Sequence, residues 1–209
     1  MDYTLWLLIA AAPVFLVGQI YLLGRKMSEP EKMIRPITGG LNSSQEEMLS
    51  RHREWLASVE LEYLTSFQFG SILVVVYQQR NTPRFFSFMF HQKVSFQIES
   101  YLEDLTILDT GTSGSGGLFP RPGAFLQSLP NISPQEAWQR HLEGEAYLST
   151  KFGYVWVPLK KPYEQLLPEA MRLRMKFNRS QLFWPFRVLY RYFVTRHRIQ
   201  NRTIAQQFP

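Results

Sequence analysis

The chain has 209 residues, of which 45% are hydrophobic and 15% aromatic, and it contains no cysteine. This length is enough for one domain and short for two, and the aromatic content is ample for a hydrophobic core. The absence of cysteine excludes disulfide bonds and thiolate metal sites, but it does not decide the compartment. The formal net charge is +6, and the excess of basic residues is local to the C-terminal tail.

The segment near the N-terminus is predicted to be a membrane-spanning helix. Residues 4–24 carry no charge, and a helix that crosses a hydrocarbon core of about 30 Å needs roughly 20 apolar residues. A cleavable signal peptide and a buried core helix are the alternatives, but a signal peptide normally begins with a basic region, which residues 1–3 lack. The predicted span includes Leu5, Trp6, Phe15, Gly18 and Tyr21.

The basic residues beside this segment predict an orientation. No Lys or Arg precedes the segment, whereas Arg25, Lys26, Lys32 and Arg35 follow it, and such residues favour the cytoplasmic flank of a span. We therefore expect an N-terminus outside and a C-terminal domain inside the cell. The expected organisation is an anchor over residues 1–26, a tether over 27–42 and a cytoplasmic domain over 43–209.

The middle of the chain predicts an α+β domain with a small antiparallel sheet. Residues 43–58 begin with serines that can cap a helix. Four extended segments follow at residues 71–77, 85–90, 93–100 and 105–108. Alternation in the third segment gives one apolar face and one wet face, on which Glu99 would lie. No long crossover separates the four segments, so an antiparallel meander is expected.

The segment that invites a chemical interpretation is rich in glycine and serine, from Gly111 to Gly117. A phosphate-binding loop of the P-loop type needs a Lys and a hydroxyl at fixed positions on a following helix, and these are missing. A flexible loop is therefore expected. Asp104 and Asp109 lie before this loop, at a position where catalytic carboxylates occur, although turn and edge residues explain them equally well.

The clearest helix start is Ser133, followed by Pro134 at the first helical position and Glu136 at the third. This helix should run to about residue 148, and residues 154–157 should form a further short strand. His141 and Glu145 lie four apart on the helix, a spacing that metal sites use, but two ligands do not make a site. We expect an exposed pair. No catalytic motif was found, so no catalysis, cofactor or metal is expected.

The tail is basic. Residues 170–209 contain no Asp or Glu and nine Lys or Arg side chains, and residues 181–207 are predicted to form an amphipathic helix with Pro185 in its first turn. The predicted contact surface comprises Phe186, Arg187, Arg191, Phe193, Arg198 and Arg202. Such a helix can lie on anionic lipid, contact a partner subunit or cover its own domain. Nucleic acid is not expected as a partner.

Two hypotheses for the function follow. The first is a single-pass, non-catalytic accessory or assembly subunit of a larger membrane protein complex, in contact with the bilayer and with other membrane-protein subunits. Small residues in the predicted span, Gly18 among them, permit close helix approach and slightly favour this hypothesis. The second is a membrane-anchored domain that binds an apolar or anionic lipid-like ligand between its sheet and the covering helices.

Overall fold

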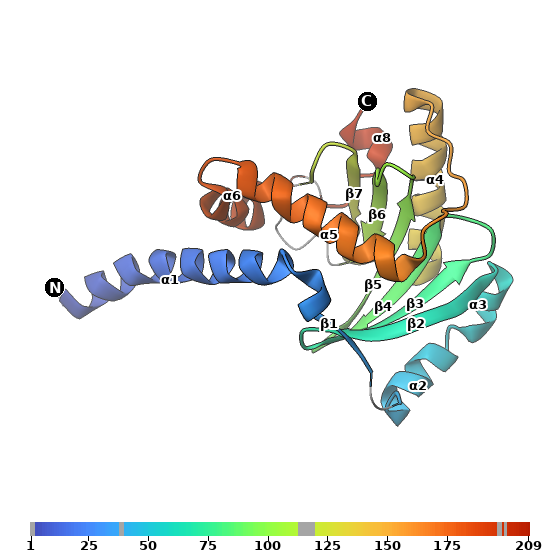
Figure 1. The fold of residues 1–209 in the computed structure, drawn as a ribbon, viewed down its shortest axis with the longest axis horizontal. Coiled ribbons are helices and arrows are strands. Elements are labelled where there is room, and N and C mark those ends of the chain that lie inside the picture. The colour runs from blue at the N-terminus through green and yellow to red at the C-terminus, as the bar shows by residue number, and fades with distance from the viewer. Residues whose placement is uncertain (1–2, 38–39, 113–119, 196–197, 199) are drawn as a thin grey trace.

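The computed structural model describes the backbone of residues 3–37, 40–112, 120–195, 198 and 200–209, and the side chains of these residues except 3–13, 23 and 195. Its centre is a seven-stranded sheet whose strands lie side by side in chain order (Figure 1). The strands are β1 (Ile34–Pro36), β2 (Leu61–Phe69), β3 (Ile72–Gln79), β4 (Arg84–Phe90), β5 (Val94–Tyr101), β6 (Ile107–Gly111) and β7 (Ala124–Ser128). The pairings from β1 to β6 are antiparallel, and β6 pairs with β7 in parallel.

Helices cover both faces of this sheet (Figure 1). One face packs on α2 (Ser43–Ser50), α3 (Arg53–Ser58) and α4 (Pro134–Phe152) through a core that includes Leu56, Phe88 and Trp138. The other face packs on α5 (Tyr163–Ser180), whose Tyr163 and Leu166 lie in a second core. The remaining elements are α1 (Tyr3–Met27), η1 (Pro30–Lys32), α6 (Trp184–Tyr190), a π-helical turn η2 (Arg191–Thr195) and α8 (Ile204–Gln207).

The predicted antiparallel meander is confirmed by β3 to β6, and the predicted start of α4 by its cap. The Ser133 hydroxyl accepts a hydrogen bond from the Glu136 amide at 3.2 Å, and Pro134 is the first residue of the helix. The helix expected over residues 43–58 is divided into α2 and α3. Residues 154–157 form no strand. The strands β1, β2 and β7 had no counterpart in the sequence prediction. The small antiparallel sheet that was expected is therefore a larger mixed sheet, because β7 pairs in parallel with β6.

The prediction of a transmembrane helix is wrong. Within the described residues, no helix combines the length and the apolar character needed to cross a membrane. The helix α1 runs from Tyr3 to Met27 and ends in the charged Arg25 and Lys26. The side chains of the predicted span residues Leu5 and Trp6 lie outside the described part of the chain. The membrane part of the fold class, the single-pass topology and the predicted localisation, N-terminus out with a cytoplasmic domain, are therefore corrected.

The segment expected to be a tether, residues 27–42, holds the turn η1 and the strand β1. Ile34, Arg35 and Pro36 pair with the end of β2, so this segment adds an edge strand to the sheet. Residues 38–39 lie outside the described part of the chain, as do residues 113–117 of the loop expected at 111–117. Gly111 itself belongs to β6.

Candidate functional site

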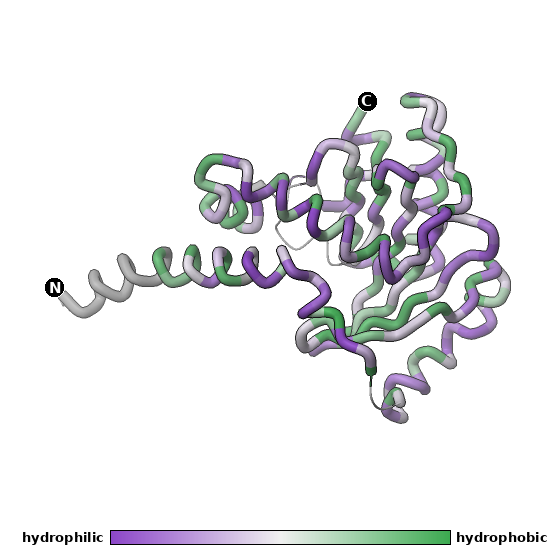
Figure 2. The backbone as a smooth tube through the Cα atoms, in the orientation of Figure 1, coloured by the Kyte–Doolittle hydropathy of each residue, from purple (hydrophilic) through white to green (hydrophobic). Residues whose placement is uncertain are grey.

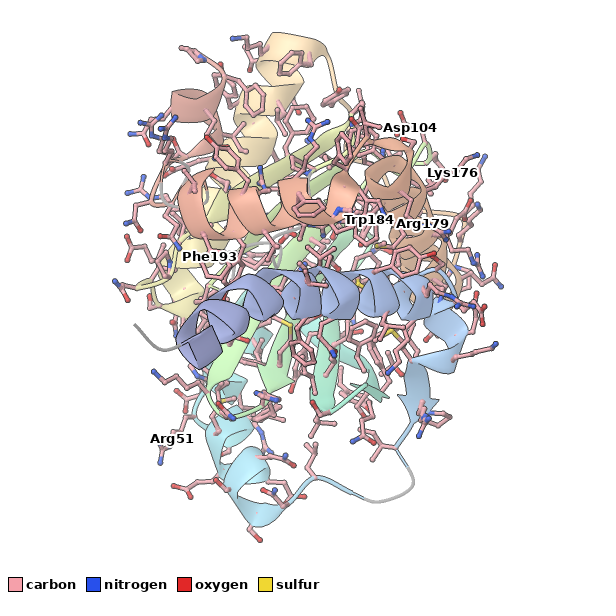
Figure 3. All side chains as sticks on the ribbon, turned by 90° about the vertical axis from the view of Figure 1, so that its left-hand side faces the viewer. Arg51, Asp104, Lys176, Arg179, Trp184 and Phe193 are labelled. Carbon is pink, nitrogen blue, oxygen red and sulfur yellow. The ribbon has the colours of Figure 1, made fainter. Side chains whose placement is uncertain are left out.

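The described part of α1 packs on α6 beside the sheet domain. Gly24 has no side chain, and a Cβ placed there would come within 2.4 Å of the Trp184 ring. Trp184, Met175 and Val188 form a small core, against which Ile20 and Met27 of α1 pack. We call residues 14–22 of α1, Leu182 and Phe183, α6 and η2 together the apolar arm. Figure 3 looks onto this arm, with Trp184 and Phe193 above α1 in that view.

The outer surface of the apolar arm is unusually hydrophobic. Figure 2 shows hydrophobic residues recurring along the described part of α1 and along α6. The exposed large apolar side chains of the arm are Val14, Phe15, Leu16, Tyr21, Leu22, Leu182, Phe183, Phe186, Tyr190, Tyr192, Phe193 and Val194. Large exposed apolar patches commonly mark sites of interaction on proteins.

The structure brings some of the predicted tail residues together and separates others. Phe186 and Phe193 are 55% and 60% exposed on the arm, and Arg187 is exposed beside them. Arg191 is half-buried, and burial together with the charge of Arg174 lowers its pKa. Arg198 is exposed as well. Pro185 lies in the first turn of α6, as predicted.

The tail does not form one helix, because its last residues return to the sheet. Gln200 bridges to Ser128 at the end of β7, and the fully buried Ile204 donates its backbone amide to the Gln127 side chain at 3.0 Å. The short helix α8 then packs on α4 and β7. Arg202 is exposed at this end of the chain, next to α8 rather than on the arm. The prediction of a single basic amphipathic helix over 181–207 is therefore wrong.

The predicted exposed pair on α4 lies inside the domain. His141 is fully buried and Glu145 is 3% exposed. Ser100 Oγ lies 2.8 Å from His141 Nε2 and donates to Glu145, and the Arg84 guanidinium donates to both oxygens of Glu145 at 2.5 to 2.9 Å. Thr110 Oγ1 accepts from Gln127 and lies 2.9 Å from His141 Nδ1. A neutral His141 with its proton on Nε2 satisfies every member of this network.

This network contains a serine, a histidine and a carboxylate, yet it is built for stability rather than for reaction. Ser100 and His141 are both fully buried, so no substrate can reach them. Burial lowers the pKa of His141 and keeps the ring neutral. Burial opposes ionisation of Glu145, but the neighbouring His141 and the hydrogen bonds from Arg84 and Ser100 lower its pKa to about 2. The network therefore holds α4 in register on β4, β5 and β6.

A second buried polar group lies on the opposite face of the sheet, under α5. Glu99 and Asp109 are cross-strand partners on β5 and β6, and both are less than a tenth exposed. They line a cavity of about 70 Å³ together with Tyr101, Arg121 and Arg174. Burial and the neighbouring Asp109 raise the pKa of Glu99 to about 8, and burial raises the pKa of Asp109 to about 6. The prediction that Glu99 lies on a wet face is wrong, because α5 covers that face.

The charge state of this acid pair follows from its surroundings. At neutral pH Glu99 keeps its proton and Asp109 is ionised, so that the single negative charge offsets the buried guanidinium of Arg174. A cavity of about 70 Å³ holds roughly two water molecules and no organic substrate. Asp109, noted from the sequence as a possible catalytic carboxylate, thus serves to fix α5 on the sheet. Asp104 accepts hydrogen bonds from Thr106 in a turn.

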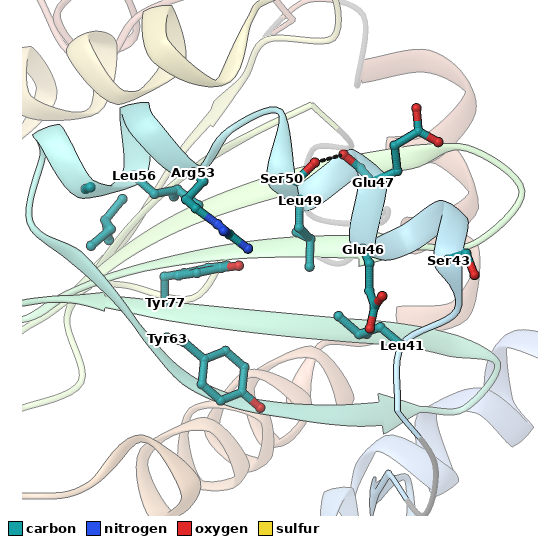
Figure 4. A pocket seen from close by; sticks show the side chains of 12 residues that line it. Leu41, Ser43, Glu46, Glu47, Leu49, Ser50, Arg53, Leu56, Tyr63 and Tyr77 are labelled. Carbon is teal, nitrogen blue, oxygen red and sulfur yellow. Dashed lines mark hydrogen bonds between the residues drawn. The ribbon is translucent and has the colours of Figure 1, made fainter.

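An open groove of about 810 Å³ lies between α2, α3 and the edge of the sheet. Figure 4 shows Tyr63 and Tyr77 along its floor and Leu49 and Arg53 reaching in from the helices. The two tyrosine rings are 6.2 Å apart and perpendicular. No pattern in the sequence predicts this groove, because it depends on where α2 and α3 cross β2 and β3.

No group of three potential metal ligands of the His, Cys, Asp or Glu type occurs among the described residues. Comparison with family models, with curated proteins and with solved structures found no match for this chain.

Proposed function

We propose that the protein is a non-catalytic accessory subunit that docks a helical segment of a partner protein on its apolar arm. The observation that carries this proposal is the row of exposed aromatic and aliphatic side chains on α1, α6 and η2. The arm has a packed interior, since Trp184 and Val188 of α6 form a small core with Met175 of α5 and with residues of α1. The aromatic residues Phe186, Tyr190 and Phe193 are of the kind that dominates binding energy at protein interfaces.

Charge identifies the chemistry of the partner. The chain carries no acidic residue between residues 170 and 209, and Arg187 lies exposed among the aromatic side chains of the arm. An apolar helix whose flanks carry Asp or Glu would match both the hydrophobic centre and the basic rim. Burial of one Phe side chain contributes roughly 1.5 to 3 kcal/mol, so a few such contacts suffice for a stable complex.

A pull-down from the source cells tests this proposal with paired variants of the full chain. Phe186→Ser with Phe193→Ser removes two exposed rings from the arm. Val94→Ser with Val155→Ser removes two side chains that are 50% and 69% exposed elsewhere. The proposal expects one protein recovered in a fixed stoichiometry by the wild type and the control, and lost with the arm variant. Equal recovery by both variants would contradict it, as would self-association alone or recovery of lipid without protein.

The groove of Figure 4 supports a second candidate function, the binding of an apolar ligand between the sheet and its covering helices. Its volume of about 810 Å³ falls within the range of small-molecule sites, and the tyrosine floor offers apolar faces with polar tips. Titration with a fluorescent fatty acid tests it. Leu49→Asp should weaken binding at least 10-fold, whereas the exposed Ser58→Asp should not, and equal binding by both variants would exclude the groove as the site.

A further inference from the structure

A basic pocket lies where α1 ends. Its volume is about 570 Å³, and it is lined by Arg25 and Lys26 from the last turn of α1, by Glu29, Lys32 and Met33 around η1, by Arg35 on β1, and by Gly70. The sequence places the four basic residues within 11 positions, and the fold turns them around one hollow because β1 pairs back along β2. The Gly70 amide donates to the Met33 carbonyl at 3.2 Å and closes the pocket at the hairpin between β2 and β3.

The charge of this pocket is poorly balanced by the residues that line it. Four basic side chains face one carboxylate, Glu29, which pairs with Lys32. The neighbouring Glu31 pairs with Arg172 of α5 and does not line the pocket. Arg25, Lys26, Lys32 and Arg35 are all exposed, so each head group can reach a solute without losing a buried contact.

We infer that this pocket binds a phosphate-bearing anion with at least two negative charges. Two guanidinium groups can each grip phosphate oxygens through paired hydrogen bonds, and two ammonium groups add charge without a fixed geometry. The volume is several times that of a phosphate group, so an organic phosphate or a phosphorylated head group fits. The same chemistry is offered by a free phosphate compound and by a lipid head group. This site is separate from the docking surface of the apolar arm.

Calorimetric titration of the full chain with pyrophosphate at low salt tests the inference. Changing Arg25, Lys26, Lys32 and Arg35 to Gln should weaken binding at least 10-fold. The control changes Arg51, Arg80, Lys93 and Lys160 to Gln, which removes the same charge from exposed positions outside the pocket. The control should bind within about 2-fold of the wild type. Equal weakening in both variants would show a nonspecific effect of net charge and overturn the site.

A second pair of variants keeps the test independent of the basic side chains. Gly70 has a φ of +62° and open space where a side chain would begin, and Asp and Asn both tolerate this backbone conformation. Gly70→Asp places a carboxylate in the pocket and should weaken pyrophosphate binding several-fold relative to the isosteric Gly70→Asn. Identical affinities of these two variants would contradict the site.

The source of the phosphate is decided by a parallel measurement. Vesicles of phosphatidylcholine with 20% phosphatidic acid present the same group on a lipid. Binding of pyrophosphate, competed by inorganic phosphate, supports a free compound, whereas binding of these vesicles alone, lost in the fourfold Gln variant, supports a head group. Absence of both kinds of binding would overturn the inference.

Discussion

Two buried carboxyl groups on opposite faces of the sheet, Glu99 and Glu145, have pKa values shifted in opposite directions. Glu145 is ionised because Arg84 and Ser100 donate hydrogen bonds to its oxygens, whereas Glu99 keeps its proton because burial and Asp109 disfavour its charge. The sequence alone does not show which of the two carboxyl groups is ionised. The spacing of His141 and Glu145 correctly indicates one face of a helix, but the partner that makes burial tolerable, Arg84, lies 61 positions away from Glu145.

Glu99 should make the protein less stable at alkaline pH. Its folded-state pKa of about 8 lies above the ordinary value, so the folded state binds this proton more tightly than the unfolded state. The stability from this proton is fully present below about pH 4.3 and is lost as the pH rises through about 8. Glu99→Gln should therefore raise the thermal midpoint at pH 9 by roughly 3 °C or more and flatten the decline between pH 6 and 9.

Calorimetric scans from pH 5 to 9 check this prediction. The exposed Glu54→Gln is the matched control and should leave the pH dependence as in the wild type. A wild-type midpoint that stays constant or rises from pH 6 to 9 would show that Glu99 is ionised in the folded protein.

Glu145 should behave in the opposite way. Its folded-state pKa of about 2 is depressed, so its stabilising contribution is present above about pH 4.3 and is lost as the pH falls through about 2. At neutral pH Glu145→Gln leaves the Arg84 guanidinium without its counter-ion and should cost about 2 to 4 kcal/mol in urea unfolding. Glu143→Gln, which breaks the exposed pair with Arg140, should cost less than about 1 kcal/mol. Similar losses for both variants would refute a structural role for the buried network.

The helices and strands that depend on neighbouring residues were predicted better than those that depend on contacts between distant parts of the chain. The alternation over residues 93–100 and the cap at Ser133 depend on neighbouring residues, and both elements are present as β5 and α4. The parallel strand β7 could not be foreseen, because its pairing with β6 is a tertiary contact that its own five residues do not reveal. Likewise, the tail divides into α6, η2 and α8 because Ile204 and Trp184 find separate apolar sites.

The apolar arm should depend on a close contact between two helices. Gly24→Ala would bring a Cβ to 2.4 Å from the Trp184 ring, and the ring must move to avoid it. Hydrogen exchange of the amides in residues 184–190 should then become several-fold faster while the amides of β3 to β5 remain unchanged. A Cβ at Gly18 has no atom within 4 Å. Gly18→Ala should therefore leave the exchange of the amides of residues 184–190 unchanged or slower, since alanine favours the helical conformation. Unchanged exchange in Gly24→Ala would show that α6 does not require this packing.

The molecule combines a sheet domain, which has buried polar groups on both faces of the sheet, with the exposed apolar arm. The α+β class, the meander and the basic tail followed from composition and periodicity. The prediction of a membrane span is wrong. The length and hydropathy of residues 4–24 do not reveal that the C-terminal half of α1 packs against α5 and α6 of the same chain. The apolar arm could not be predicted from the sequence, since it joins residues 14–22 to residues 182–195.

Photo-crosslinking in the source cells tests whether the apolar arm holds a partner protein. A photoreactive phenylalanine analogue replaces Phe186 on the arm or, as a control, Val94 on β5, two side chains of similar exposure. We expect a single protein adduct from position 186, attached at an apolar helix flanked by acidic residues, and none of it from position 94. The same adducts from both positions, or no protein adduct from position 186, would show that the arm is not a docking surface for a partner protein.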